Sequence, residues 1–580
     1  MIVKMKKVTL LVSEQARLDA LKKLRSLGVL HVNEIKIPAA EDIQELQRKI
    51  DEVDKTNVTL EGDADTNKSM EPEELVSKVL ELTQKKDILQ HELAEKEDAH
   101  SWFETWGKVS LASVKTLQEA DIFLRFYSTD KDGLKRIPEE KRIVIVSENK
   151  DIIKIAFFGE SEDDRLDLIE QRMPRFEVAE LEERMKDIRG QLAEIDNTIA
   201  ELTLYKHVLV DYRAELLKQL EFSNVLHGMG EENQFAYVQG FCPQNKLEQV
   251  KNTSDEQGWG YIIEEPDDPA QVPTLLENKK PARFLEPLLK FMGTFPGYKE
   301  VDVSFIFLVF FSVFYAMIIG DAGYGFIFLI GTIWARLKNK NAPMEPFALF
   351  YILSITTIIW GLITGTWFGS QRLAQLPFLQ PFIIDTMFSF NEADEATNFM
   401  MKFTFILGLI HLVIGRLIAF KREWPSPKAF ANIGWIFTLV GIFNLVRYLV
   451  LSEPMPQWAW IVLAIGFFLV ALFVNFQKNV LKAFFGSLFT TILDTIGSLS
   501  DVVSYIRLFA VGIATVKVAA AFNDMAAGFL APLILIFGHG LNIILGLMSV
   551  MVHGVRLNML EFSGHLGQEW SGKPYDPFRE

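Results

Sequence analysis

The stretch SFIFLVFFSVFYAMIIGDAGYGFIFLIGTIWA, residues 304–335, decides the fold of this chain. Its 32 residues include one charged side chain, Asp321, and the run is apolar and long enough to lie in about 30 Å of hydrocarbon. The segment GDAGYG, residues 320–325, interrupts the run near its middle, where glycine and aspartate favour a turn. Each limb then has about 16 residues, so the stretch predicts a hairpin of two short helices held among others.

Charge is distributed unevenly on the two sides of this hairpin. Residues 1–300 hold 42 Lys and Arg against 59 Asp and Glu, whereas residues 301–580 hold 17 against 16. Hydrophobic residues nevertheless make up 49% of the 580 residues, so the pattern predicts a charged half in water followed by a membrane half. The net charge of −16 and the absence of a Lys/Arg-rich tract argue against a nucleic-acid partner.

The charged half has no sign of secretion or catalysis. Its single cysteine, Cys242, excludes an intrachain disulfide and a cysteine-based zinc finger. The apolar run near Met1 is too short for the core of a signal peptide, so we expect this half in the cytoplasm. The half contains no phosphate-binding loop, no zinc-protease motif and no hydrolase nucleophile motif. We therefore expect no catalytic residue, no cofactor and no metal.

Periodicity divides the charged half into lobes and helical arms. Strand-like and helix-like runs alternate at its start, return after residue 223, and recur between two long charged helical stretches. We expect an antiparallel coiled coil between two α/β lobes. The predicted boundaries are residues 1–280 for the cytoplasmic domain, with a proximal lobe at 1–40 and 224–265, arms at 41–106 and 176–223 and a distal lobe at 107–175, then 281–300 for a proline-rich linker and 301–580 for the membrane domain.

The second arm carries the clearer heptad pattern. Its apolar residues alternate in steps of four and three, which predicts a strip that another helix covers. They are Leu181, Met185, Ile188, Leu192, Ile195, Ile199 and Leu202. The first arm fits the same spacing if Lys86 fills one position. Periodicity alone gives equal weight to a generic spacer or dimerisation rod.

Alternating loop charge predicts how the membrane half is threaded. The apolar stretches are 304–335, 346–369, 398–420, 429–450, 457–476, 483–524 and 529–560. Lys and Arg gather at 336–340, 416–428 and 478–482, whereas the loop 371–398 is acidic. Because basic loops stay in the cytoplasm, the first stretch must cross twice. We expect eight membrane segments with both termini inside, and Gly361, Gly365 and Gly369 as a ridge for close helix contact.

The last two stretches carry charges where a membrane disfavours them. They have about 42 and 32 residues, so they must be tilted or project from the bilayer. The first carries Asp494, Asp501, Arg507 and Lys517, and the second carries His539, His553, Arg556 and Glu561. A central Asp or Arg costs roughly 2.5–3.5 kcal/mol on insertion scales, so an ion pathway is the default interpretation. Internal ion pairing as structural glue, for instance between Asp501 and an arginine of the last stretch, is the alternative.

A helical projection separates two faces on the first of these stretches. Asp494, Ser498, Asp501, Tyr505 and Gly512 fall on an acidic polar face. The opposite face carries Ser500, Ser504 and Arg507 among alanines, which suits the close approach of another helix. On the last stretch Asn542, Ser549, His553 and Arg556 share a stripe that suits a wetted vestibule.

These two stretches resemble subunit a, called subunit I in prokaryotes, of the vacuolar-type and archaeal-type rotary ATPases. The matching residues are SYIRLFA at 504–510 and HGVRL at 553–557 with Glu561, followed by YDPF at 575–578. GDAGYG at 320–325, the glycines 361 to 369 and QGFCP at 239–243 add to the resemblance, which covers essentially the whole chain. One departure is Gly546, where some family members have a glutamate.

The resemblance implies a non-catalytic stator and ion-channel subunit in a prokaryotic plasma membrane. Its expected partners are a proteolipid ring, peripheral stalks and, transiently, the cap of the central stalk. Two offset half-channels would lead protons or sodium ions to ring carboxylates, with Arg507 between them. The other residues expected on the ion path are Arg556, His553, Glu561, Asp494, Asp501 and Ser504. Two alternatives from other classes are a secondary transporter with broken helices and internal repeats, and a membrane-anchored coiled-coil tether.

Overall fold

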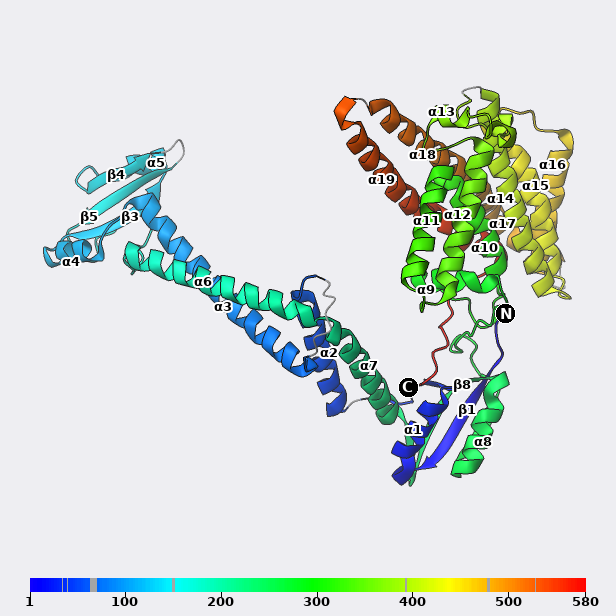
Figure 1. The fold of residues 1–580 in the computed structure, drawn as a ribbon, viewed down its shortest axis with the longest axis horizontal. Coiled ribbons are helices and arrows are strands. Elements are labelled where there is room, and N and C mark those ends of the chain that lie inside the picture. The colour runs from blue at the N-terminus through cyan, green and yellow to red at the C-terminus, as the bar shows by residue number, and fades with distance from the viewer. Residues whose placement is uncertain are drawn as a thin grey trace. The chain divides into compact units, whose positions relative to one another are not determined.

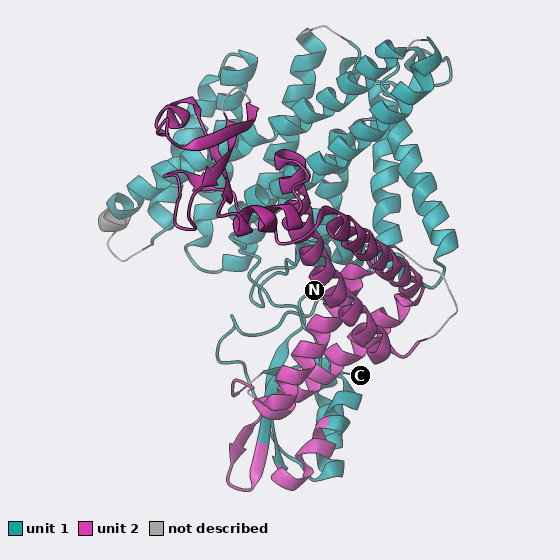
Figure 2. Cartoon of the chain, turned by 90° about the vertical axis from the view of Figure 1, so that its left-hand side faces the viewer, with its two compact units in different colours: residues 1–12, 22–33, 237–579 teal, residues 13–21, 34–236, 580 magenta. Residues whose placement is uncertain are grey.

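The structure is a computed structural model that describes the chain except for residues 34, 39, 63–69, 149–151, 392–393, 477–479, 527 and 580. Figure 2 colours its two compact units, which are residues 13–21 and 34–236, and residues 1–12, 22–33 and 237–579. The first unit contains helical arms and a small sheet. The second contains another sheet and all the apolar helices.

Paired long helices form the arms of the first unit. They are α2 (Glu41–Thr59) with α7 (His207–Gly228), and α3 (Pro72–Trp106) with α6 (Val178–Leu202). Ion pairs from Lys86 to Asp196 (2.7 Å) and from Glu92 to Arg184 (2.8 Å) run in opposite chain order, so α3 and α6 are antiparallel. The heptad residues Ile188 and Ile195 are buried against Leu89 of α3, because a strip of apolar side chains avoids water by facing another strip.

The second arm is not one continuous helix. We expected residues 176–223 to form a single arm, but α6 ends at Leu202, and the 3-10 turn η2 (Thr203–Tyr205) precedes α7. Lys206 donates a hydrogen bond to the Leu60 carbonyl oxygen (2.6 Å) beside this turn. The break lets each half of the arm pack on a different partner helix, α6 on α3 and α7 on α2.

A four-stranded sheet lies between α3 and α6 in sequence. Its strands are β3 (Phe123–Thr129), β4 (Arg142–Glu148), β5 (Ile153–Gly159) and β6 (Ile169–Glu170), in the order β4-β5-β3-β6 and all antiparallel. The helices α4 (Leu111–Glu119) and α5 (Lys131–Lys135) flank them. Trp102 and Trp106 at the end of α3 contact Phe126 edge to face, which joins the sheet to the arm.

The sheet of the other unit is built from both ends of the charged half. Its strands are β1 (Met5–Ser13), β2 (His31–Asn33), β8 (Phe235–Pro243) and β9 (Gly260–Glu264), in the order β2-β8-β1-β9. Two helices, α1 (Arg17–Leu27) and α8 (Leu247–Gln257), accompany them, and β7 (Gly230–Glu232) precedes β8. A Cβ atom on Gly240 would overlap the carbonyl oxygen of His31, so the QGFCP segment needs glycine where β8 meets β2.

The expected linker is partly helical. We predicted a proline-rich linker over residues 281–300, and η4 (Ala282–Leu285) and α9 (Glu286–Met292) occupy most of it. Leu285 and Leu289 are fully buried in the apolar core of the membrane helices. Pro287 stands in the first turn of α9, where a missing backbone N–H costs nothing. The prolines here therefore begin a helix rather than prevent one.

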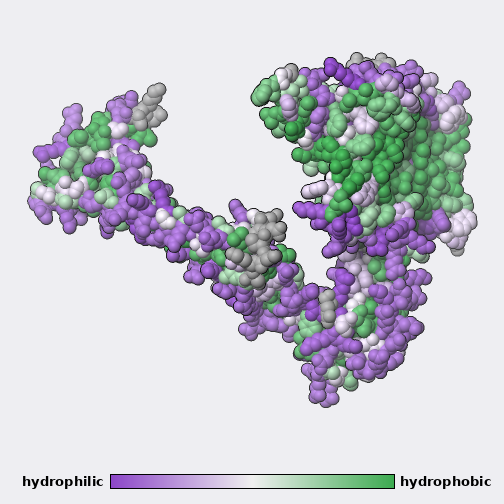
Figure 3. Space-filling model, viewed as in Figure 1, coloured by the Kyte–Doolittle hydropathy of each residue, from purple (hydrophilic) through white to green (hydrophobic). Residues whose placement is uncertain are grey.

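The apolar half is a bundle of helices (Figure 1). They are α10 (Ser304–Ile319), α11 (Ala322–Lys338), α12 (Met344–Thr364), α14 (Asp394–Glu423), α15 (Ala429–Leu451), α16 (Gln457–Phe473), α17 (Val480–Ser504), α18 (Ile506–Met525) and α19 (Ala531–Ser549). Short turns α13 (Gln371–Ala374), η5 (Gln380–Phe382) and η6 (Asp385–Met387) follow α12. Hydrophobic side chains cover the visible middle of the bundle, and hydrophilic ones gather at its ends (Figure 3).

Five stretches within the described residues are long and apolar enough to cross a membrane. They are Met344–Thr364, Glu395–Glu423, Ala429–Leu451, Phe484–Met525 and Gly528–Leu566. The apolar helices α10 and α16 are shorter. The chain is thus a membrane protein, and the count of eight segments stays a prediction.

The quoted hairpin does consist of two helices. Asp321 stands between α10 and α11, and its carboxylate accepts the backbone N–H groups of Gly323, Tyr324, Phe368 and Gly369. A buried carboxylate needs such donors because it has left water. The aspartate therefore joins the start of α11 to the loop after α12.

The predicted glycine ridge permits close helix contact at two positions, but it is not one face of a helix. A Cβ atom on Gly369 would lie 2.5 Å from Cβ of Ala519 on α18. A Cβ atom on Gly361 would overlap the backbone nitrogen of Ala322, so this glycine does permit close contact. The helix α12, however, ends at Thr364, and Gly365 and Gly369 have φ angles of +70° and +63°. Glycine adopts this left-handed conformation without steric cost, and the two residues shape the loop that meets Asp321.

Candidate functional site

Two long stretches at the end of the chain carry the candidate site. Phe484–Met525 spans 42 residues, with α17 and α18 meeting at a turn on Tyr505, and Gly528–Leu566 spans 39. The first confirms the length expected from the sequence, and the second is longer than expected. The last stretch comprises η7 (Gly528–Leu530), α19, two π-helical segments η8 (Val550–Gly554) and η9 (Leu557–Phe562), and α20 (Ser563–Leu566). Such π turns often occur at functional sites.

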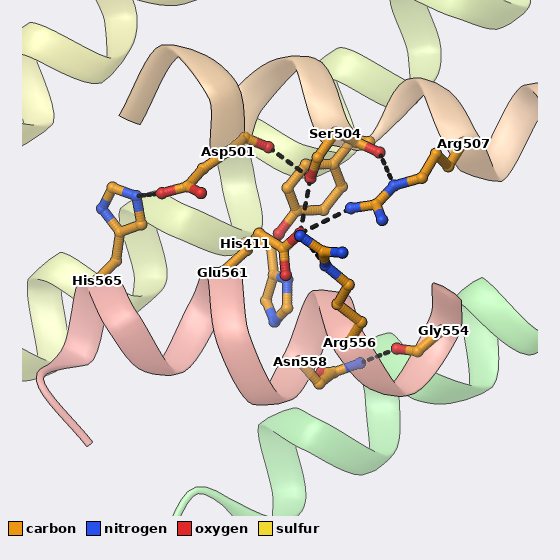
Figure 4. A network of polar contacts seen from close by, with 10 residues as sticks. His411, Asp501, Ser504, Arg507, Gly554, Arg556, Asn558, Glu561 and His565 are labelled. Atoms are coloured by element: carbon orange, nitrogen blue, oxygen red, sulfur yellow. Dashed lines mark hydrogen bonds and ion pairs between the residues drawn. The ribbon is translucent and has the colours of Figure 1, made fainter. Parts of the chain in front are cut away.

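One carboxylate oxygen gathers the charged groups of both stretches (Figure 4). Oε1 of Glu561 accepts hydrogen bonds from Nη2 of Arg507 (2.7 Å) and Oγ of Ser504 (3.0 Å), and Nε of Arg556 lies 3.5 Å away. The Glu561 side chain is 4% exposed, against 23% for Arg507 and 54% for Arg556. Glu561 is therefore the buried centre of the cluster, and the two arginines reach it from the more open side.

The geometry leaves capacity for a further partner at this centre. Oε2 of Glu561 is buried and accepts no hydrogen bond from the described residues. Arg507 uses Nε on the Ser504 carbonyl oxygen (3.0 Å) and one terminal nitrogen on Glu561. A guanidinium carries five N–H donors in a planar fork, so Arg507 retains donors for a second carboxylate without leaving the first.

A second charged contact lies one helical turn further along the last stretch. His565 is buried, and its Nε2 lies 3.0 Å from Oδ2 of Asp501. Arg416 of α14 donates its Nε–H to Nδ1 of His565 (3.0 Å). Arginine can only donate hydrogen bonds, so Nδ1 of His565 must accept one from Arg416. The ring proton of His565 therefore lies on Nε2, which donates a hydrogen bond to the Asp501 carboxylate. Three helices thus share one Arg–His–Asp chain.

The turn at Tyr505 is anchored by a buried histidine. The Tyr505 hydroxyl lies 2.8 Å from Nδ1 of His411, whose ring stacks between Phe310 and Phe562 with centroids 4.0 Å and 4.4 Å away. A Cβ atom on Gly408 would lie 2.5 Å from the Tyr505 ring. These contacts hold α14 against the junction of α17 and α18, immediately beside Arg507.

A separate polar cluster lies beyond Arg507, toward the end of α18. The Tyr324 hydroxyl lies 2.8 Å from Nδ1 of His539 and accepts an N–H of Asn542 (3.0 Å). Nε2 of His539 lies 3.1 Å from Oδ1 of Asn523, and Asn542 also bonds the Thr515 carbonyl oxygen (2.9 Å). Three helices, α11, α18 and α19, supply this second cluster.

The structure brings together most of the residues singled out from sequence. Ser504, Arg507, Arg556 and Glu561 meet at one point, and Asp501 lies nearby on His565. Asp494 is an exposed residue of α17, and its carboxylate lies within electrostatic range of Arg416. Nδ1 of His553 on η8 is buried and bonds no described residue.

The predicted separation of two faces does not hold. Asp501 and Arg507 were placed on opposite sides of one helix, yet both reach the last stretch. The helix is interrupted at Tyr505, and the long Arg507 side chain turns back to the Ser504 carbonyl oxygen. The pairing of Asp501 with an arginine of the last stretch, one form of the structural alternative, is replaced by its contact with His565.

Sequence reasoning missed His565, Arg416, His411 and Tyr324. His565 follows Glu561 by four residues, which places the two on one helical face, and this spacing was the available signal. Arg416 was counted with a basic loop, whereas it lies within α14. Partners that arrive from helices distant in sequence leave no local pattern.

The chain is similar to subunit I of V-type and A-type ATP synthases. The chain is 32% identical to V-type ATP synthase subunit I of Borreliella burgdorferi and 31% identical to V-type ATP synthase subunit I 1 of Treponema pallidum, covering 100% of both chains in each case. A-type ATP synthase subunit I of Methanocaldococcus jannaschii is 28% identical over 70% of this chain and 65% of its own.

Two other comparisons add little. The chain matches no protein-family model. A crystal structure of the cytoplasmic N-terminal domain of subunit I, homologue of subunit a of V-ATPase, is similar over 44% of this chain and 99% of that one, at 14% identity and a TM-score of 0.24.

Proposed function

The chain belongs to the V-type ATP synthase subunit I family, a membrane subunit rather than the catalytic one, and from this premise we propose that it forms the fixed wall past which a ring of proteolipid subunits turns. In this role Arg507 stands between two ion paths. The observation that carries the proposal is a partly exposed arginine held in the membrane half by a buried glutamate, at 2.7 Å.

Arg507 separates the paths through its charge. A ring carboxylate that passes a guanidinium is favoured in its ionised form, so it must give up its proton or sodium ion before it moves on. Such a step blocks a direct leak. Ala510 and Ala514, on the same side of α18, are exposed and small, and small side chains let another helix approach closely.

Two polar clusters support two offset paths. The first surrounds Asp501, Glu561 and His565, and the second surrounds Tyr324 and His539. They lie toward opposite ends of α18, and polar groups within membrane segments mark ion pathways. We assign one half-channel to each cluster, with Arg556 and His553 on the wall of the first.

The cytoplasmic arms serve assembly in this proposal. The paired helices α3 and α6 present many charged side chains around an apolar seam, and the sheet at their end offers a site for peripheral stalks. The central-stalk cap would touch the arms only transiently. We further propose a multi-pass protein of a prokaryotic plasma membrane with both termini in the cytoplasm, which cysteine labelling at Asn339 from either side tests.

The central experiment measures ATP-driven ion uptake in vesicles containing the complete complex. Arg507→Gln should abolish uptake, because a neutral amide cannot force the release of an ion. Arg507→Lys should fail as well, since an ammonium lacks the planar fork. Lys517→Gln removes a positive charge further along the same helix and serves as the matched control, with subunit content measured in every preparation.

A structural role for the Arg507–Glu561 pair is the second candidate, and the 2.7 Å contact itself favours it. A double variant separates the two. If the arginine only neutralises Glu561, then Arg507→Gln with Glu561→Gln should recover transport, whereas a role toward the ring leaves the double variant inactive. Near-normal uptake by an assembled Arg507→Gln complex would contradict the proposal. Co-purification without nucleotide-binding subunits would favour a lone transporter or a tether.

A further inference from the structure

The residues after α20 form an extended strap. The strap is Ser571–Arg579, and Figure 1 draws it as the red trace that ends at the label C. Gly572 donates its N–H to the Phe295 carbonyl oxygen (3.0 Å), Thr274 donates to the Lys573 carbonyl oxygen (2.7 Å), and Tyr575 donates to the Thr274 carbonyl oxygen (3.1 Å). Its backbone therefore pairs in parallel with the chain that leads into the membrane helices.

The far end of the strap is anchored on the cytoplasmic sheet. Phe578 is 1% exposed and donates its N–H to the Leu30 carbonyl oxygen (2.9 Å). The Tyr575 hydroxyl donates to the Val29 carbonyl oxygen (2.7 Å), and Nδ1 of His31 lies 2.7 Å from the Asp576 carbonyl oxygen. A buried aromatic ring removes a large apolar area from water, and the hydrogen bonds around it fix its position.

The near end is anchored on the membrane helices. The Trp570 indole donates to Oγ of Ser563 on α20 (2.7 Å), and its ring meets Phe307 of α10 edge to face at 6.1 Å. Glu569 donates its N–H to Oε1 of Glu300 (2.7 Å). Between the anchors, a Cβ atom on Gly572 would overlap the carbonyl oxygen of Pro296. The strap can be seated only with glycine there.

We propose that Ser571–Arg579 is a tie that positions the last membrane stretch for ion transfer. This inference rests on the proposed function. It adds a structural link that carries force from the last membrane stretch to the sheet. A ring that turns past Arg507 pushes sideways on the last stretch. One polypeptide link between the sheet and the bundle can bend, whereas two hydrogen-bonded links side by side resist bending and twisting. Because Trp570 bonds Ser563, the tie acts on α20 and so on the contact of His565 with Asp501.

The test uses the complete complex in vesicles and measures ions transported per ATP hydrolysed. Gly572→Val should leave ATP hydrolysis and its KM for ATP in place, yet lower the ions transported per ATP by roughly tenfold, since small displacements at a site have large effects. Truncation after Ser571 should do the same. Gly190→Val is the matched control, because a Cβ there meets nothing within 4 Å. An unchanged transport ratio in the Gly572→Val complex overturns the tie.

A disulfide tests the strap without removing it. The Cβ atom of a residue at Gly28 would lie 3.3 Å from Cβ of Arg579, slightly below the usual spacing of about 3.5–4.5 Å in disulfides. Because Gly28 has a φ angle of +61°, where a side chain is strained, the reduced double variant is the reference for the oxidised one. The native Cys242 will not compete, because burial raises the pKa of its thiol to about 12. The oxidised Gly28→Cys, Arg579→Cys complex should keep its transport ratio. If oxidation stops turnover and reduction restores it, the strap must detach during rotation and the tie is wrong.

The two proposals fail separately. If the Arg507→Gln complex pumps normally and the Gly572→Val complex loses coupling, the tie is supported and the proposed role of Arg507 is refuted. If the Arg507→Gln complex does not pump and the Gly572→Val complex couples normally, only the tie is refuted. A Gly572→Val chain that does not enter the complex leaves the disulfide pair as the deciding measurement.

Discussion

The α3–α6 pair of the charged half and the two terminal stretches of the membrane half are built from the same components in opposite places. In α3 and α6 the apolar residues Leu89 and Ile188 lie inside, and ion pairs such as Arg184–Glu92 lie outside. The side chain of Arg184 is 44% exposed, and that of Glu92 is 29% exposed. In the terminal stretches the apolar surface faces outward, and the ion pair Arg507–Glu561 lies inside, with 23% and 4% exposed.

The difference teaches where an ion pair matters. In water, the net contribution of an exposed pair is small because solvent replaces the lost partner. In a buried site no solvent is at hand, so removing one partner strands the other. The same bond length therefore has a different consequence in each region, and substitutions can measure it.

The largest effect is expected from an apolar residue of the α3–α6 pair. Ile188 is fully buried, and Ile188→Ala should lower stability by about 4 kcal/mol, within the usual range for a large cavity. Amide hydrogen exchange of α3 and α6 in the whole chain is the measurement. Exchange as slow as in the parent chain would mean that the seam does not hold the helices together.

The next effect is expected from a charge of the membrane pair. Arg507→Gln should destabilise the membrane half by about 3 kcal/mol, because Glu561 stays buried and keeps only the longer, more exposed contact with Arg556 (3.5 Å) as an ion pair among the described residues. Glu561→Gln should cost less, since both arginines are partly exposed and can turn to water. Thermal unfolding of the detergent-solubilised chain gives the order. Equal midpoints for the two variants would remove the claim that Glu561 is the buried centre.

A moderate effect is expected at the Arg–His–Asp chain. His565→Leu removes the group between Asp501 and Arg416 and should lower the stability of the membrane half by about 2 kcal/mol, since polar groups lose their partners. His565→Gln is the matched variant. Because glutamine keeps one donor and one acceptor, its loss of stability should be smaller than that of His565→Leu. The same thermal unfolding measures both.

The smallest effect is expected from the exposed pair. Arg184→Gln should leave hydrogen exchange of α6 unchanged within error at pH 7. The hydrogen bond from Arg184 holds the pKa of Glu92 below its usual value of 4.5, so any contribution is present above pH 4.5 and is lost as the pH falls through the lowered folded-state pKa. A clear destabilisation at pH 7 would erase the contrast between the two regions.

Much of the architecture was predictable because it follows from single segments. Charge segregation marked the two halves, Gly320 and Asp321 marked the hairpin, and the spacing of Ile188 and Ile195 marked a helix pair. Each of these signals depends on residues that are neighbours along the chain. Arg507 and Glu561 were found for a related reason, since a charge in an apolar run is visible without its partner.

The contacts that complete the site were not predictable in the same way. His565 meets Arg416 across 149 residues and Tyr324 meets His539 across 215, and no periodicity connects such pairs. The helical projection also failed where its premise failed, because α18 begins anew at Tyr505. A projection assumes one unbroken helix with constant turn.

The π-helical segments η8 and η9 make the length of the last stretch part of its design. A π turn takes up about one residue more than an α turn, so each records, in effect, an insertion that the bundle has accommodated. Deleting a single residue within Leu557–Phe562 would return the turn to α geometry, and the residues after it could keep their places. His565 would then still face Asp501. The same deletion within α19 has no π turn at that point to absorb it, and it would swing the residues that follow by about 100° around the axis. Relatives of this chain should therefore show single-residue gaps in the π segments rather than in α19.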